Sequence, residues 1–329
     1  MDEQIIQPFS VTKLELIPPS FSRLCSDEIF HILLFLGRAE VANWFRVSTF
    51  WNEQCRLLPL SIVLSFGNTE KLHSFLQCPR HLNVTALKLL DITDCTTDRE
   101  NCKQLAACRH LKNTKTLELC NNPKIDSEQL ETLLTSPHLT QLTDLDISNC
   151  CIRDAVMTRI TENHSTIKRL NLSYNGMCSV EPITSSPFMS NLTYLNIYAN
   201  KYCNTSAQLI ASSPHMQNLT ELRLGGVKRK HRRGGSSATR FATLFMRATI
   251  SNLGVQSIAD SIYLKNLKCL SMTNGRVTDE GAELLAKSEG LESLMILNLS
   301  FNPITTVGQE MLKNSNFVHL TDLRLTIKH

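Results

Sequence analysis

A nine-residue skeleton recurs along most of this chain and constrains its fold more than any other feature. In the stretch 142–150 (LTDLDISNC), apolar residues occupy the first, fourth and sixth positions, and the ninth is Cys. The same skeleton, with Asn at its ninth position, returns at 167–175, 192–200 and 294–302. Its fourth position recurs at intervals of 22 to 30 residues, at Leu87, Leu117, Leu145, Leu170, Leu195, Leu222, Leu244, Leu270, Leu297 and Leu323. Spacing this regular predicts an array of similar structural units.

Each unit is expected to join a short strand to a helix. Apolar residues at helical spacing follow the skeleton, as in 127–134 and 279–286, and a Ser-Pro pair often ends the helix, as at Ser136-Pro137. A skeleton of the form L-x-x-L-x-L-x-x-N/C in units of about 26 residues resembles the ribonuclease-inhibitor-like class of leucine-rich repeat. The resemblance implies an α/β solenoid, with a parallel sheet on the concave face and helices on the convex face.

The residues before the repeats follow a different pattern. Residues 1–19 form a polar arm that ends in Pro18-Pro19, a pair that continues neither a helix nor a central strand. Ser26 suits the N-cap of a helix whose apolar residues recur at helical spacing until Gly37, and a second short helix is expected after it. We therefore predict a flexible arm over 1–19, a small helical domain over 20–60 and the repeat domain over 61–329.

The helical stretch resembles an F-box. The likeness is carried by 24–36 (LCSDEIFHILLFL) and, after a short turn, by Val47 and Trp51. Cys25 stands where the family usually has Pro, and 37–40 (GRAE) replaces its usual Asp-Pro turn. The resemblance implies that a Skp-type adaptor, and through it a cullin ligase core, contacts the following side chains: Leu24, Ile29, Ile32, Leu33, Leu36, Val47 and Trp51.

The helical pair has a second interpretation, as a cap that shields the apolar edge of the first repeat. The alternating stretch 60–66 (LSIVLSF) argues against it, because this stretch already suits an edge strand that could close the array. The F-box interpretation is therefore the preferred one, and the cap remains the alternative.

Side-chain alternation along a strand divides each skeleton into two sets. Leu145 and Ile147 are expected to face the helices, whereas the residues between them face outward. The ninth-position residues Asn175, Asn200 and Asn302, together with Cys95 and Cys150, are expected to bond loop backbone and to be structural. Ser173 and Ser300 are expected to point outward as well. We predict that a target protein contacts the outward side chains Asp144, Asp146, Arg169, Asn171, Tyr194, Tyr198, Arg223 and Asn298.

One repeat is irregular. A basic run replaces the expected helix and predicts a loop over 228–240, because such a segment cannot bury apolar area. The run can act as a nuclear-import signal, as a contact for an acidic partner, or as a solvated insertion. Its charged residues are Lys228, Arg229, Lys230, Arg232 and Arg233.

Composition excludes several classes of protein. With 34 basic and 30 acidic residues, the formal charge of +4 argues against nucleic acid as the main partner. The chain has no C-x-x-C pair, no secretory signal and no apolar run near the roughly 20 residues of a membrane span, which predicts reduced thiols and a cytoplasmic protein, with the nucleus as the alternative. No nucleophile, metal-ligand or cofactor motif has usable spacing, so we expect no catalytic residues, no cofactor and no small-molecule substrate.

Two functions remain open at this level. Resemblance to F-box proteins with leucine-rich repeats implies the substrate-recognition subunit of a cullin-type ubiquitin ligase, in which 20–60 bind the adaptor and the concave face binds the target. The alternative is a ribonuclease-inhibitor-like binding scaffold or GTPase regulator whose N-terminal helices only cap the solenoid.

Overall fold

The computed structural model describes residues 59–77, 83–92, 97–226, 250–315 and 317–326. The chain divides into two compact units, Met1–Leu58 and Pro59–His329. The first unit, which holds the predicted arm and F-box-like stretch, lies outside the described residues. The fold below is that of the second unit.

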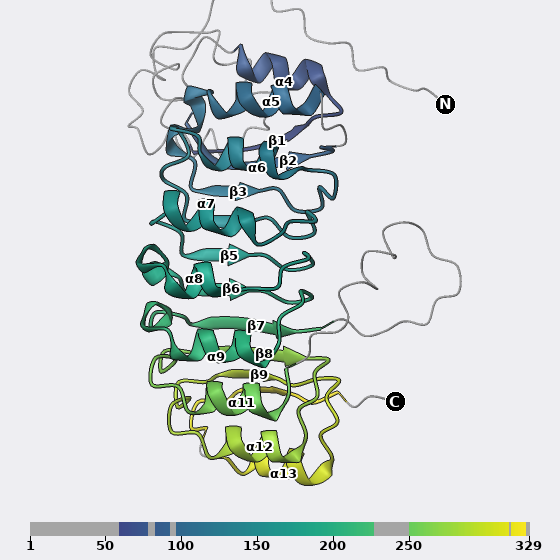
Figure 1. Cartoon of the computed structure of the whole chain (residues 1–329), viewed down its shortest axis with the longest axis vertical. Coiled ribbons are helices and arrows are strands. Elements are labelled where there is room, and N and C mark those ends of the chain that lie inside the picture. Colours follow the sequence, from purple (N-terminus) through teal and green to yellow (C-terminus); the bar gives the residue numbers. More distant parts are fainter. Residues whose placement is uncertain (1–58, 78–82, 93–96, 227–249, 316, 327–329) are drawn as a thin grey trace, which may run out of the picture. The chain divides into compact units, whose positions relative to one another are not determined.

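A ten-stranded sheet runs through the second unit, and every neighbouring pair of strands is parallel. The strands lie in chain order, as a stack of similar units requires (Figure 1). They are β1 (Leu60–Ser65), β2 (Val84–Leu90), β3 (Thr116–Glu118), β4 (Asp144–Asp146), β5 (Arg169–Asn171), β6 (Tyr194–Asn196), β7 (Glu221–Gly225), β8 (Cys269–Thr273), β9 (Ile296–Asn298) and β10 (Asp322–Arg324).

Helices connect successive strands and cover one face of the sheet (Figure 1). The α-helices are α4 (Thr69–Leu76), α5 (Thr97–Ala106), α6 (Ser127–Leu134), α7 (Ala155–Asn163), α8 (Glu181–Ser185), α9 (Asn204–Ser212), α11 (Asn252–Ala259), α12 (Asp279–Ala286) and α13 (Thr306–Lys313). Short 3-10 helices lead into three of the strands: η2 (Arg109–Asn113), η3 (Pro187–Asn191) and η4 (Pro214–Met216). The predicted α/β leucine-rich-repeat solenoid is thereby confirmed.

The predicted leucine markers align across the sheet in one register, with one exception. Leu145 pairs with Leu170, Leu170 with Leu195 and so on, and their side chains are buried between the sheet and the helices. The prediction for Leu244 was wrong: β7 pairs directly with β8, so no strand separates them. Leu244 itself lies outside the described residues. The strand predicted at the start of the array is β1, which pairs with β2.

The ninth-position asparagines tie each repeat to the one before it, as predicted. The buried Asn175 accepts bonds at Oδ1 from the backbone N–H groups of Cys150 (3.0 Å) and Ile152 (3.2 Å). Its Nδ2 donates to the carbonyls of Ile147 and Leu172, both at 2.9 Å. These bonds satisfy loop groups that the short strands leave unpaired. The same pattern recurs at Asn200 and Asn302.

The ninth position of the β2 unit was misread as Cys95, which lies outside the described residues. The structure places Ile92 there, with its backbone N–H bonded to Asn122 Oδ1 at 3.0 Å. Asn122 also donates to the carbonyls of Leu89 and Leu119, and so acts as Asn175 does.

Serines form a second ladder where the helices end. Each hydroxyl donates to a carbonyl near the end of the preceding repeat's helix, where carbonyls lack intrahelical partners. The pairs are Ser136 to Ala106, Ser186 to Thr161, Ser213 to Thr184, Ser261 to Ala211 and Ser288 to Ala259. The Ser-Pro pairs that end the helices in the sequence therefore also join neighbouring repeats.

Candidate functional site

The face of the sheet opposite the helices is open, and its outward side chains form two aligned rows. The first row comprises Ala86, Thr116, Asp144, Arg169, Tyr194, Glu221, Cys269, Ile296 and Asp322. The second row comprises Lys88, Glu118, Asp146, Asn171, Asn196, Arg223, Ser271, Asn298 and Arg324. Seven of the eight predicted target contacts lie in these rows, and Tyr198 follows β6 two residues after the second row.

Two arginines flank Tyr194 on this face. The guanidinium carbon of Arg169, from the neighbouring strand β5, lies 4.2 Å from the centre of the Tyr194 ring, and that of Arg223, from β7, lies 5.8 Å away. Each arginine is also held by a carboxylate: Arg169 by Asp144 at 3.3 Å and Arg223 by Glu221 at 2.6 Å. Burial raises the pKa of the Tyr194 hydroxyl, which stays a neutral donor at physiological pH. The stack is pre-ordered, and both guanidinium groups stay about half exposed.

A pair of tyrosines lies at the other end of the same strands. The rings of Tyr174 and Tyr198 meet edge to face, with centroids 5.5 Å apart and planes at 69°. Burial raises the pKa of the Tyr198 hydroxyl, and the neighbouring Thr273 and Asn274 side chains act in the opposite direction. Three of the five tyrosines in the chain therefore gather on the open face of two adjacent repeats. We call Tyr174, Tyr194, Tyr198, Arg169 and Arg223 the tyrosine patch.

Gly225 lies beside the tyrosine pair and packs closely against β8. Its carbonyl accepts a bond from Ala199 N–H, and it pairs with Thr273 of β8. Its φ of 111° lies in the left-handed region, and a Cβ there would stand 2.2 Å from the Thr273 carbonyl oxygen. Only glycine fits this position, because any side chain would meet the β8 backbone.

Sequence reasoning missed Tyr174. This residue follows the β5 skeleton's outward positions and adopts φ 57°, like its counterparts in other repeats. Asp91, Asn121, Asn149 and Asn274 hold that place in four other repeats, and Ala199 and Phe301 hold it in two more. Asp and Asn tolerate the left-handed region better than Tyr. The Tyr174 side chain is 46% exposed, so core packing does not explain it. A costly residue that remains exposed points to surface contact. Because Ala199 and Phe301 also depart from the Asn/Asp pattern, that pattern alone does not single out Tyr174.

Three of the predicted contacts are already engaged within the protein. Asn171 Oδ1 accepts bonds from the backbone N–H and the hydroxyl of Ser173, and its Nδ2 donates to Asp146 at 2.9 Å. Asp146 accepts the equivalent pair of bonds from Ser148, and Asn298 accepts from Ser300 N–H. These side chains form local turns at the strand ends. Few of their hydrogen-bonding groups therefore remain for a partner protein. The same bonds explain why Ser173 and Ser300, predicted to point outward, are buried.

The predicted adaptor-contacting residues and the basic-loop residues lie outside the described part of the chain. They are Leu24, Ile29, Ile32, Leu33, Leu36, Val47 and Trp51, and Lys228, Arg229, Lys230, Arg232 and Arg233.

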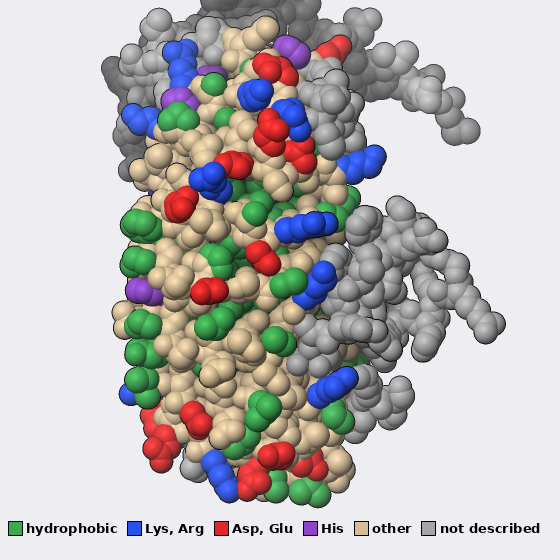
Figure 2. Space-filling view, in the orientation of Figure 1, with side chains coloured by type: hydrophobic (Ala, Val, Ile, Leu, Met, Phe, Trp, Pro, Cys, Tyr) green, Lys and Arg blue, Asp and Glu red, His purple; other side chains and the backbone are tan. Residues whose placement is uncertain are grey.

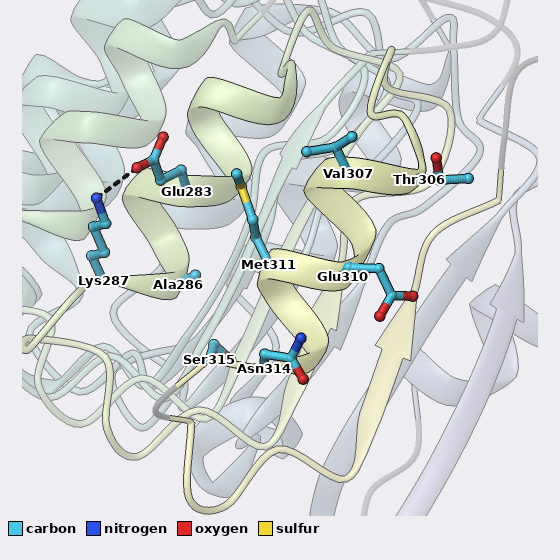
Figure 3. Close-up of a pocket in the computed structure, with 9 residues that line it drawn as sticks. All are labelled: Glu283, Ala286, Lys287, Thr306, Val307, Glu310, Met311, Asn314 and Ser315. Atoms are coloured by element: carbon cyan, nitrogen blue, oxygen red, sulfur yellow. Dashed lines mark hydrogen bonds and ion pairs between the residues drawn. The ribbon is translucent and has the colours of Figure 1, made fainter.

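A shallow surface groove of about 770 Å³ lies between α12 and α13 (Figure 3). Met311 and Val307 line one wall, and Ala286 with the Glu283–Lys287 ion pair lines the other. Its glutamates pair with lysines of their own helices, Glu283 at i,i+4 and Glu310 at i,i+3, as expected for a solvated helix face. Within the described ranges, no three His, Cys, Asp or Glu side chains are arranged to hold a metal, and no helix is long and apolar enough to cross a membrane.

Residues 263–286 and 290–313, which contain β8 with α12 and β9 with α13, match the sequence model of a family described as Leucine Rich repeat. No curated protein sequence matches the chain.

Among solved structures, internalin C2 of Listeria monocytogenes is 22% identical, with 69% of this chain and 84% of that chain covered and a TM-score of 0.45. Internalin inlF of the same organism is 18% identical, with 75% and 68% covered and a TM-score of 0.43.

Proposed function

We propose that this leucine-rich-repeat chain is the substrate-recognition subunit of a cullin-type ubiquitin ligase. In this role the open face binds a target protein at the tyrosine patch, and residues 20–60 bind a Skp-type adaptor. The chain itself performs no chemistry, because a receptor of this kind contributes proximity and orientation. The less specific statement, that the chain is a protein-binding scaffold, is supported by the leucine-rich repeats themselves.

The observation that carries the target-binding part is the Arg169–Tyr194–Arg223 stack. Tyrosine and arginine dominate the energetics of protein interfaces, since they combine large apolar area with directed hydrogen bonds. Here the side chains are held in place by one another and by Asp144 and Glu221 before any partner arrives. Pre-ordering lowers the conformational entropy lost on binding.

The adaptor-binding part rests on the F-box resemblance of 24–51. The test is a pull-down of the full chain with a purified Skp-type adaptor. We expect the wild type to bind, and Ile32→Asp with Leu36→Asp to abolish binding while the circular dichroism of the repeats is unchanged. The matched control is Leu253→Asp, an exposed apolar residue on α11 that should leave adaptor binding intact. A wild-type chain that fails to bind would overturn the ligase role and leave a binding scaffold.

A further inference from the structure

A basic edge runs along the side of the sheet where the strands begin, which is the left margin of Figure 1. Lys115, Lys168 and Lys268 each stand directly before a strand, at β3, β5 and β8, and all three are exposed. Strands in a sheet lie about 4.8 Å apart, so successive members of this set are roughly 10 Å and 14 Å apart. Lys112 and Lys265, in the turns that precede β3 and β8, are exposed as well. We call these five lysines the strand-start lysines.

The strand-start lysines lack the partners that other basic residues have. Lys88, Lys287 and Lys313 each pair with a glutamate at 2.5 to 2.9 Å. None of the strand-start lysines forms an ion pair with a carboxylate of the described residues. Their positive charges are therefore uncompensated along one edge.

Two grooves beside the strand-start lysines have the same chemistry, whereas a third groove on this edge, before β9 and β10, contains Glu289 and Glu292. One of about 420 Å³ is lined by Lys168, Lys268, Asn191, Asn218, Asn266, Thr193, Thr220 and Ser293. The other, of about 370 Å³, is lined by Lys112, Lys115, Asn83, Asn113, Thr85, Thr140 and Gln141. Neither lining contains a carboxylate or a large apolar side chain. The grooves thus offer ammonium groups, amides and hydroxyls alone.

Hydrogen bonds to the preceding repeat hold the polar side chains of the larger groove. Asn191, Asn218 and Asn266 each donate from Nδ2 to a turn carbonyl, of Ser165, Ser190 and Gln217 respectively. An amide nitrogen carries two N–H donors, so one donor of each asparagine remains for a ligand. Donors between lysines at fixed spacing suit carboxylates arranged along an extended chain.

Apolar side chains border the same edge on its helix side. Phe188, in η3, is 49% exposed and Ile262, in the turn after α11, is 67% exposed. They lie in the turns that lead into β6 and β8, on either side of the β7 turn that contains His215, and close in sequence to Asn191 and Asn266. Figure 2 shows hydrophobic side chains in a column along this margin. A ligand that fills the groove can therefore also bury apolar side chains.

We infer that this edge binds an extended acidic segment of a partner protein, with carboxylates in the Lys168–Lys268 groove and apolar side chains against Phe188 and Ile262. The groove adjoins the tyrosine patch, because Lys168 and Thr193 directly precede Arg169 and Tyr194, but it shares no residue with the patch. It adds a second contact and does not depend on the ligase role. The lysine charges favour an acidic ligand. The apolar border favours a protein segment over nucleic acid, whose backbone has no apolar groups to bury.

The test is fluorescence anisotropy of the full chain with a labelled peptide of about twelve residues, glutamates with two leucines. Lys168→Glu with Lys268→Glu should weaken binding roughly tenfold or more, because two ion pairs become two like-charge contacts. The matched control is Lys71→Glu with Lys103→Glu on α4 and α5, which makes the same change in net charge on exposed helix positions. The control should bind as the wild type does. Equal weakening of both variants would overturn the proposal, since the attraction would then be general.

Two further binding experiments distinguish a protein segment from nucleic acid as the ligand. Phe188→Ser with Ile262→Ser should weaken peptide binding without changing its dependence on salt, which reports the charged contacts. A single-stranded oligothymidylate of equal charge should bind more weakly than the peptide. If the oligonucleotide binds more tightly than the peptide, and the Lys168→Glu, Lys268→Glu variant loses this binding, the proposal of a protein segment would be overturned in favour of nucleic acid. Circular dichroism of each variant confirms that the repeats are folded.

Discussion

The guanidinium carbon of Arg169 lies 4.2 Å from the centre of the Tyr194 ring, and the two residues pair across β5 and β6 at the same register position. They are 25 residues apart in the sequence, so stacking of repeats alone brings them together. With Arg223 from β7, three consecutive strands build the stack. Binding at this face is therefore expected to depend on the alignment of repeats as much as on the side chains themselves.

Tyr194→Ala should weaken binding to a target protein, once one is captured with the wild-type chain, by about 2 kcal/mol or more, as at the centre of other interfaces. Isothermal titration calorimetry measures the change. The control is Ser271→Ala, an outward residue two strands away on β8, which should leave the affinity unaltered. Similar losses in both variants would place the contact elsewhere on the face.

Tyr174→Asn should weaken the same binding while changing the free energy of unfolding by less than about 1 kcal/mol. Asn relieves the left-handed strain at φ 57°, and this gain offsets the lost ring contact with Tyr198. Urea denaturation and calorimetry on one preparation separate the two effects. A large loss of stability would show that Tyr174 is a packing residue.

Leu172→Ala should destabilise the protein by about 2–5 kcal/mol, because its fully buried side chain leaves a cavity between sheet and helices. Asn171→Ala, next to it on the open face, should cost about 1 kcal/mol through the lost bonds to Ser173 and Asp146. Urea denaturation ranks the two, and a reversed order would contradict the register.

Stability should fall in mild acid because of His164. Burial lowers the pKa of its imidazole below the ordinary value near 6.5, while the Leu134 carbonyl at 2.7 Å from Nε2 acts in the opposite direction. The unfolded chain then binds the proton more readily than the folded one. The contribution is present above the unfolded pKa and is lost as the pH falls toward the folded pKa. His164→Gln should lose less stability than the wild type between pH 7.5 and pH 5.5 in urea titrations, and equal losses would assign the acid sensitivity to other groups.

Thiol reactivity should differ between two cysteines of the β4 and β6 repeats. Burial raises the pKa of Cys150 to about 12, so its thiolate is scarce at neutral pH. The pKa of Cys203 is lowered: its partial burial acts to raise it, but bonds from Thr205 and Ser206 at the start of α9 outweigh that effect. Iodoacetamide at pH 7.5 should therefore modify Cys203 well before Cys150, as measured by peptide mass spectrometry. Faster modification of Cys150 would mean that the repeat opens locally.

The period of the sequence was sufficient to predict most of the fold. Leu145, Leu170 and Leu195 recur at one position of a short strand, and Asn175 and Asn200, five residues after the last two, each bond the turn of the preceding repeat. Both features depend only on contacts within one repeat or between adjacent repeats. The repeating sequence pattern is therefore enough to predict them. The pattern failed at Leu244, where an apolar residue at a plausible interval belongs to no strand between β7 and β8.

What the sequence by itself determined is the repeating unit, its inward leucines and asparagines, and the outward rows in which a binding face must lie. Only the tertiary structure decided which outward residues are available to a partner protein. Asn171 already accepts a hydrogen bond from Ser173, whereas the rings of Tyr174 and Tyr198 meet at the strand ends. It also decided that Lys168 and Lys268 share one groove without a carboxylate. The physical reason is that alternation along a strand sets the direction of a side chain, while its neighbours come from repeats about 25 residues away and become known only once the repeats are stacked in register.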